Sequence, residues 1–126
     1  MRMKELQEKA EQLGIVITDQ QAEQFQIYYD RLIEKNKVMN LTAITEYQEV
    51  IDKHFIDSIL LGTVMDLSKE QSMIDVGTGA GFPGIPLKIV YPELEITLLD
   101  SLNKRVKFLE EVVAELKLQN IQAVHM

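Results

Sequence analysis

Three alternating glycines follow an acidic residue in the middle of the chain. Asp75 lies in a short apolar run, residues 73–76, and Gly77, Gly79 and Gly81 come directly after that run. Glycine reaches positive φ angles at no steric cost and has no side chain to hold a ligand away from the main chain. We therefore predict a strand that turns into a ligand-binding loop, in preference to a glycine turn with no ligand.

A second acidic residue ends the next apolar run. Asp100 lies 19 residues beyond Gly81, follows residues 96–99 and precedes an amphipathic helical pattern. The carboxyl ends of neighbouring parallel strands share one edge of a sheet, so we expect Asp100 to accept hydrogen bonds there from the two hydroxyls of a ribose. A surface acid without a ligand is the alternative. Burial of Asp75 is costly unless its carboxylate is bonded to loop amides or paired with a cationic group of the ligand.

Two classes of nucleotide site compete for these residues. Gly79, Gly81 and Gly84 satisfy the dinucleotide pattern G-x-G-x-x-G. They begin three residues after the last apolar residue of the strand and include Pro83, which is a poor register for a pyrophosphate at a helix start. The pattern D-x-G-x-G-x-G, which starts at Asp75, matches instead the first motif of S-adenosylmethionine-dependent methyltransferases. This second reading is favoured over NAD binding.

The resemblance extends to a particular family. Residues 75–87 (DVGTGAGFPGIPL) and 99–106 (LDSLNKRV) resemble the ribosomal RNA small subunit methyltransferase G family, also called glucose-inhibited division protein B. Residues 36–42 (NKVMNLT) and 54–60 (HFIDSIL) are similar to that family too, so the resemblance covers nearly the whole chain. It implies a Rossmann-like class I methyltransferase fold with a helical N-terminal extension. It also implies methylation of guanine N7 in 16S ribosomal RNA, either free or in the 30S particle.

The resemblance further implies which residues bind S-adenosylmethionine. From spacing alone Phe82 is a core residue, whereas the family places a cofactor contact there. Ser101 is also a candidate N-cap for the helix that follows Asp100. The implied cofactor-binding residues are Asp75, Gly77, Gly79, Gly81, Phe82, Asp100, Ser101 and Leu102.

Composition restricts the other possibilities. The 126 residues hold no cysteine and only two histidines, so we expect no metal site. No apolar run is long enough for a membrane helix and no signal peptide is present, which predicts a cytoplasmic protein. The 20 acidic residues outnumber the 13 basic ones, and charge alone favours a small-molecule or protein substrate over RNA. The one compact basic cluster, which either contacts RNA phosphates or faces solvent, comprises Lys104, Arg105 and Lys107.

Hydrophobic periodicity predicts an α/β fold in two parts. Residues 1–72 form an all-helical cap, with helices over 3–13, from a capping box at Thr18–Gln21 to about Asn40, and from a second capping box at Thr45–Gln48 to Gly62. Residues 73–126 form the first half of a Rossmann-like domain with parallel strands in the order 3-2-1. Its predicted strands are 73–76, 95–100 and 121–124, and its predicted helices are about 83–91 and 102–118.

A doubly wound sheet normally continues on the other side of its first strand. The family also carries an Arg-x-Glu segment near the adenine, after the third strand, and the sequence ends at Met126 before it. We therefore expect an N-terminal fragment of a longer enzyme, inactive by itself and prone to self-association through the free edge of its first strand. A nonenzymatic helical interaction module is the alternative from another class.

His54, Asp57 and Ser58 share one face of a predicted helix, which invites comparison with a catalytic triad. Triad members converge from different segments, so we interpret these residues as a polar seam between the helical cap and the sheet. No catalytic residue is assigned. Guanine N7 has a free lone pair and loses no proton on methylation, so positioning of the reacting groups suffices.

Overall fold

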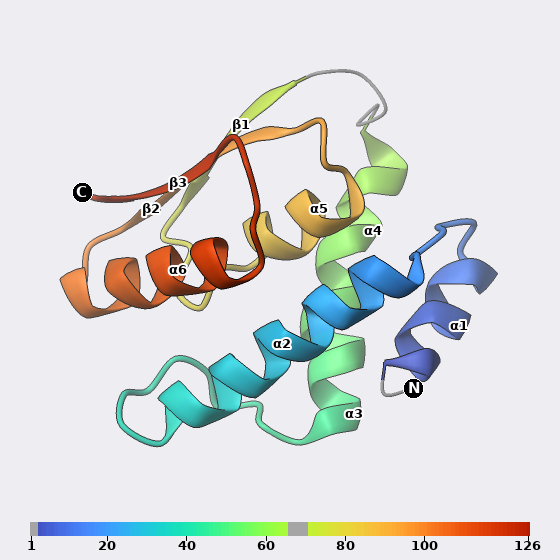
Figure 1. Ribbon diagram of the computed structural model, residues 1–126, viewed down its shortest axis with the longest axis horizontal. Helices are drawn as coiled ribbons and strands as arrows, with labels where there is room; N and C mark the ends of the chain where they lie inside the picture. The colour runs from blue at the N-terminus through green and yellow to red at the C-terminus, as the bar shows by residue number, and fades with distance from the viewer. Residues whose placement is uncertain (1–2, 66–70) are drawn as a thin grey trace.

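The computed structural model describes residues 3–65 and 71–126 (Figure 1). In this part of the chain, one sheet holds three parallel strands: β1 (Ser72–Val76), β2 (Glu95–Asp100) and β3 (Ile121–His125). Their spatial order is β1-β2-β3. The predicted α/β class and the 3-2-1 order of parallel strands are confirmed.

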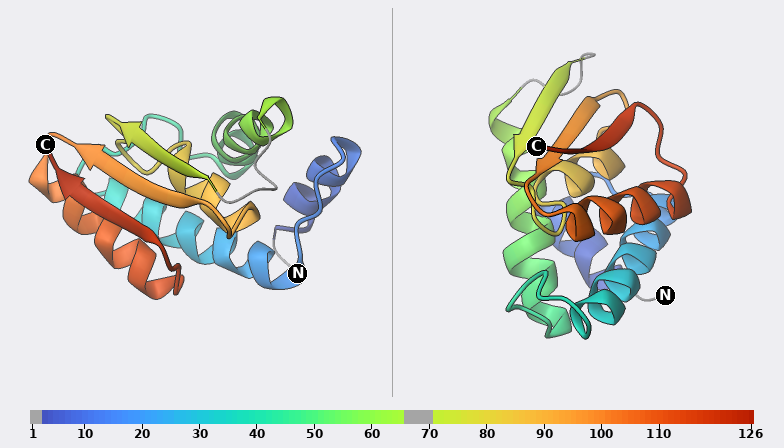
Figure 2. Two further views of the ribbon diagram at one scale, coloured as in Figure 1. Left: turned by 90° about the horizontal axis from the view of Figure 1, so that it is seen from above. Right: turned by 90° about the vertical axis from the view of Figure 1, so that its left-hand side faces the viewer.

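Two helices connect the strands. Helix α5 (Gly84–Val90) joins β1 to β2, and α6 (Asn103–Glu115) joins β2 to β3. Ile96 and Leu98 of β2 point toward these helices and are buried, whereas Ile74 and Val76 on the other face of β1 are exposed. Figure 2 shows the same asymmetry, with α2, α5 and α6 on one side of the sheet. Self-association through the free edge of β1 remains a prediction.

The N-terminal part of the described chain is helical. It comprises α1 (Lys4–Gln12), α2 (Asp19–Asn36), the short α3 (Tyr47–Glu49), a π-helical segment η1 (Val50–Ile56) and α4 (Asp57–Val64). Phe25, Tyr28 and Phe55 from these helices form one continuous hydrophobic core with Ile85 of α5 and Leu98 of β2. The helical region therefore contributes directly to the surroundings of the loop after β1. The division of the chain into domains at residue 72 stays a prediction.

Helix α2 begins as predicted and ends early. The Thr18–Gln21 capping box forms, because Thr18 Oγ1 accepts the Gln21 N–H and Gln21 Oε1 accepts the Thr18 N–H. The expected extension to Asn40 is wrong. Asn36 Oδ1 accepts the N–H groups of Leu41 and Thr42, at 2.8 and 2.9 Å, which holds the chain in a turn directly after the helix.

The predicted N-caps of two later helices are wrong. Glu46 takes the N-cap position in place of Thr45, and its side chain accepts the Gln48 N–H. Ser101 does not cap α6, whose N-cap is Leu102 with no side-chain cap bond. Asp100 Oδ1 accepts the Leu102 N–H there instead.

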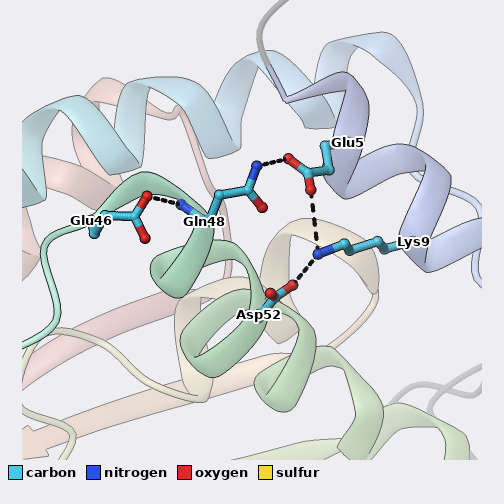
Figure 3. Close-up of polar contacts among 5 residues, drawn as sticks. All are labelled: Glu5, Lys9, Glu46, Gln48 and Asp52. Atoms are coloured by element: carbon cyan, nitrogen blue, oxygen red, sulfur yellow. Dashed lines mark hydrogen bonds and ion pairs between the residues drawn. The ribbon is translucent and has the colours of Figure 1, made fainter.

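A surface network fastens α1 to the helices that follow (Figure 3). Lys9 bonds to Asp52 of η1 and pairs with Glu5 one turn earlier, and Gln48 donates to Glu5. Exposed ion pairs add little net stability because water competes for the same charges. The network therefore orients α1 against η1, while buried apolar residues such as Leu6 supply the packing.

Candidate cofactor-binding site

The loop of residues 77–83 follows the carboxyl end of β1, and its first residues are hydrogen-bonded to β2. The N–H groups of Gly77 and Thr78 both donate to the Leu99 carbonyl, at 2.8 and 3.0 Å. Gly77, Gly79 and Gly81 have φ angles of 68°, 60° and 103°. These are the positive values that the alternating glycines predicted.

The three glycines differ in what surrounds them. A Cβ atom added to Gly77 or Gly79 would meet no heavy atom within 4 Å, so their main chain borders open space. A Cβ on Gly81 would lie 2.7 Å from Ile85 Cδ1 and 2.8 Å from the Tyr28 hydroxyl oxygen. Gly77 and Gly79 thus leave room for a ligand against the backbone, whereas Gly81 is required for packing.

Asp75 holds the loop from beneath. Its side chain is buried, and Oδ2 accepts the Thr78 hydroxyl at 2.7 Å and the Gly84 N–H at 3.0 Å. Burial raises the pKa of the Asp75 carboxyl, and these two hydrogen bonds oppose that rise. The bond to the Gly84 amide agrees with one of the two partners expected for a buried Asp75. Sequence reasoning missed Thr78, although its hydroxyl lies inside the glycine motif.

Because burial penalises the charged form of Asp75, we expect Asp75→Asn to change the free energy of unfolding by less than about 1 kcal/mol at pH 7. One amide oxygen can accept both hydrogen bonds. Asp75→Ala leaves the Thr78 hydroxyl and the Gly84 N–H buried without an acceptor and is expected to cost about 1 to 3 kcal/mol. Urea denaturation of both variants tests this. If Asn proves as destabilising as Ala, the negative charge itself is required.

Asp100 closes the other side of the loop. Its side chain is 2% exposed. Oδ2 accepts the Gly79 N–H at 2.9 Å, Oδ1 accepts the Leu102 N–H at 2.9 Å, and Arg105 Nη1 lies 3.6 Å from Oδ1. The predicted convergence of the glycine loop and Asp100 is therefore present. Each oxygen of the Asp100 carboxylate thus already accepts one main-chain N–H group.

The helical region supplies a third side of the loop. The His54 ring stacks on the Phe82 ring with centroids 4.2 Å apart and planes 8° from parallel. The Tyr28 hydroxyl donates to the Ala80 carbonyl at 2.6 Å. Burial lowers the pKa of His54, which favours the neutral ring, and the negative charge of Asp57 opposes this shift. Sequence reasoning found Phe82 and placed His54 between the helical cap and the sheet, but it missed their stacking and the Tyr28 bond.

Comparison with known proteins gives the family. A family model described as GidB, rRNA small subunit methyltransferase G, matches residues 21–126. The chain belongs to the rRNA small subunit methyltransferase G family. The resemblance drawn from the glycine motif is thereby confirmed.

Relatives named ribosomal RNA small subunit methyltransferase G are similar over most of the chain. The protein of Lachnoclostridium phytofermentans is 58% identical over 113 residues, which cover 90% of this chain and 47% of that protein. The protein of Macrococcus caseolyticus is 55% identical over 98% of this chain and 51% of its own length. For Staphylococcus epidermidis the identity is 51%, over 99% and 52%. The chain spans about half the length of these curated relatives.

Within this family member, the other residues that sequence reasoning selected lie at the rim. Ser101 is exposed and the Leu102 side chain is 51% exposed, next to Asp100. Lys104 and Lys107 are exposed on α6, whereas Arg105 is half-buried and paired with Asp100. Of the three residues in the basic cluster, the two lysines are therefore the ones exposed for contact with an external phosphate.

The remaining candidates form no further reaction centre. His54 Nε2 bonds to Thr42 Oγ1 at 2.8 Å and not to Ser58, which is buried one turn later. Among residues 3–65 and 71–126, no group of three or more His, Asp or Glu side chains could hold a metal ion. None of the helices described is both long and apolar enough to cross a membrane.

Proposed function

We propose that this chain supplies the first half of an S-adenosylmethionine site in an enzyme that methylates N7 of a guanine in 16S ribosomal RNA. The observation that carries the proposal is the open backbone at Gly77 and Gly79 beside the Asp100 carboxylate. A ligand with no phosphate suits this site, because Arg105 is already paired with Asp100, the carboxylate that accepts the Gly79 N–H. The family membership and the names of the relatives support the same reading.

Each site residue has a defined task in this proposal. The main chain at Gly77 and Gly79 lies against the cofactor, and the Asp100 carboxylate accepts its ribose hydroxyls. Ser101 and Leu102 line the rim, and Phe82 borders the site on the side of the helical region. Asp75 keeps the loop in shape through its bonds to the Thr78 hydroxyl and the Gly84 N–H.

When bound, S-adenosylmethionine supplies an electrophilic methyl group on its sulfonium. Guanine N7 attacks through a lone pair and gives up no proton, so the protein needs no general base. The contribution of the chain is to fix the cofactor in line with the base and to exclude water. This agrees with the absence of any assigned catalytic residue.

RNA binding rests mainly on other parts of the full-length protein. The chain has a net charge of −7, and phosphate contacts need Lys or Arg. Lys104 and Lys107 are the local candidates, since Arg105 is engaged with Asp100. The net negative charge favours a small-molecule or protein substrate as the alternative.

The test uses the full-length parent enzyme with tritiated S-adenosylmethionine. Its substrate is free 16S ribosomal RNA or 30S particles from a strain that lacks the enzyme. We expect the label in 7-methylguanosine at one position of the RNA after nuclease digestion and mass spectrometry. We also expect residues 1–126 alone to show almost no transfer. Label on a protein or a small metabolite, or none in 7-methylguanosine, overturns the RNA assignment.

Calorimetry on the 126-residue chain separates the cofactor classes. S-adenosylhomocysteine is expected to bind, although weakly, in clear preference to NAD. A preference for NAD points to an oxidoreductase, and no heat with either ligand favours a nonenzymatic module.

A further inference from the structure

The helical region holds the glycine loop at two adjacent points. Tyr28 of α2 bonds to the Ala80 carbonyl through a buried hydrogen bond that joins residues 52 positions apart. His54 of η1 stacks on Phe82, two residues further along the loop. The Tyr28 contact is fully buried, whereas His54 and Phe82 are half-buried at the edge of the site. The stacked pair is thus the less buried of the two contacts.

The orientation of the His54 ring is itself fixed from outside the loop. His54 Nε2 and Thr42 Oγ1 are 2.8 Å apart. Thr42 Oγ1 also accepts the Ile44 N–H at 3.0 Å, so the hydroxyl that contacts the ring is itself held by the main chain. The Thr42 backbone is in turn held by Asn36 Oδ1 at the end of α2. A continuous series of contacts therefore runs from Asn36 through Thr42 and His54 to Phe82.

The helix that carries His54 has an unusual form. Val50–Ile56 is π-helical, with a wider turn than the α-helix that follows it. Such segments redirect side chains relative to an α-helix and are frequent at functional sites. Here Phe55 packs into the core against Phe25 and Tyr28, while its neighbour His54 lies against Phe82. The π-helical segment thus places one ring in the core and the next on the loop.

We propose that His54 is a positioning residue, which transmits the conformation of the Asn36–Thr42 turn to the glycine loop through its stacked contact with Phe82. The loop at residues 80–82 then keeps the shape that leaves Gly77 and Gly79 open to a ligand. The consequence for cofactor affinity rests on the proposed function, whereas the coupling between the turn and the loop does not. His54 itself touches no reacting atom in this proposal.

The test compares two threonine variants of the 126-residue chain by NMR without ligand. Thr42→Val removes the hydroxyl that holds His54 and leaves both rings in place. Thr63→Val is the matched control, because Thr63 is exposed and its hydroxyl donates to the Leu60 carbonyl within its own helix. We expect Thr42→Val to shift the ring signals of His54 and the amide signals of residues 80–82, and to speed hydrogen exchange in the loop. Thr63→Val is expected to change neither.

Two variants of His54 add a rescue. His54→Ala removes the stacked ring and is expected to change the loop signals in the same direction as Thr42→Val, by a larger amount. His54→Phe keeps a flat ring on Phe82 but loses the bond to Thr42, so its loop signals are expected to return only to those of Thr42→Val. If Thr42→Val alters only signals near Thr42, or if His54→Phe behaves like His54→Ala, the positioning role is wrong.

Calorimetry with S-adenosylhomocysteine then separates this proposal from the proposed function. We expect Thr42→Val and His54→Ala to weaken binding by about 5-fold or more, at a temperature where both remain folded, and Thr63→Val to have no effect. No binding by the unsubstituted chain counts against the cofactor site, while the loop signals still decide the role of His54. Unchanged affinity in Thr42→Val despite shifted loop signals overturns the link to the ligand.

Discussion

Gly81→Ala is expected to lower the free energy of unfolding by about 2 to 5 kcal/mol, the combined cost of a left-handed backbone and an overpacked core. Gly81 has a φ angle of 103°, and an added Cβ would lie 2.7 Å from Ile85 Cδ1 and 2.8 Å from the Tyr28 hydroxyl. Neither neighbour can yield freely, because both side chains are fully buried and the Tyr28 hydroxyl bonds to Ala80. Urea denaturation measures the loss directly.

Gly79→Ala is expected to cost less stability than Gly81→Ala and to weaken ligand binding more. Its Cβ meets nothing within 4 Å, so only backbone strain remains, at about 1 to 2 kcal/mol. The new methyl group fills the space beside the main chain where we place the cofactor. We expect the affinity for S-adenosylhomocysteine to fall at least about tenfold, which corresponds to 1.4 kcal/mol.

The control for both variants is Gly14→Ala. Gly14 also has a positive φ, of 80°, and open space around its Cβ position, but it lies between α1 and α2, away from the loop. It should show the same strain as Gly79→Ala with unchanged affinity. Equal affinities for Gly14→Ala and Gly79→Ala would remove the ligand role of Gly79. Equal stabilities for Gly79→Ala and Gly81→Ala would disprove the tight packing at Gly81.

The second large effect is expected at Asp100. Asp100→Ala removes the acceptor for the ribose and should weaken binding of S-adenosylhomocysteine by about 1.5 to 3 kcal/mol, or roughly 10- to 150-fold. The same change frees the Gly79 and Leu102 N–H groups, which costs about 1 to 3 kcal/mol of stability if they remain buried. Calorimetry below the unfolding transition gives the first quantity and urea denaturation the second.

Asp75→Ala separates the two effects of Asp100. Both carboxylates hold the loop, but Asp75 accepts the Thr78 hydroxyl and the Gly84 N–H, whereas Asp100 accepts the N–H of the open Gly79. If Asp100 acts only by holding the loop, the two alanine variants should lose affinity in proportion to their loss of stability. A larger loss of affinity for Asp100→Ala supports direct contact with the ribose. Unchanged affinity in a folded Asp100→Ala variant refutes it.

The sequence by itself determined those features that depend on neighbouring residues. Alternating glycines permit positive φ angles wherever the chain goes, so the loop conformation at Gly77 and Gly79 could be predicted. The capping box at Thr18 joins residues three positions apart, and it formed as expected. Strands separated by helices imply parallel pairing, which the sheet shows. Family membership was also within reach, because its motifs are contiguous.

Only the tertiary structure decided which of these residues serve packing and which remain open. Gly79 and Gly81 look equivalent in sequence, and the difference arises because Tyr28, more than fifty positions away, packs against one of them. Helix α2 ends at Asn36 because its side chain accepts the Leu41 N–H, and α6 lacks a Ser101 cap because Asp100 accepts the Leu102 N–H. Local sequence patterns do not favour these acceptors over other polar side chains nearby. The stacking of His54 on Phe82 had no signal in the spacing of either residue. Contacts between distant segments form only when a shared core brings them together, so no local pattern encodes them.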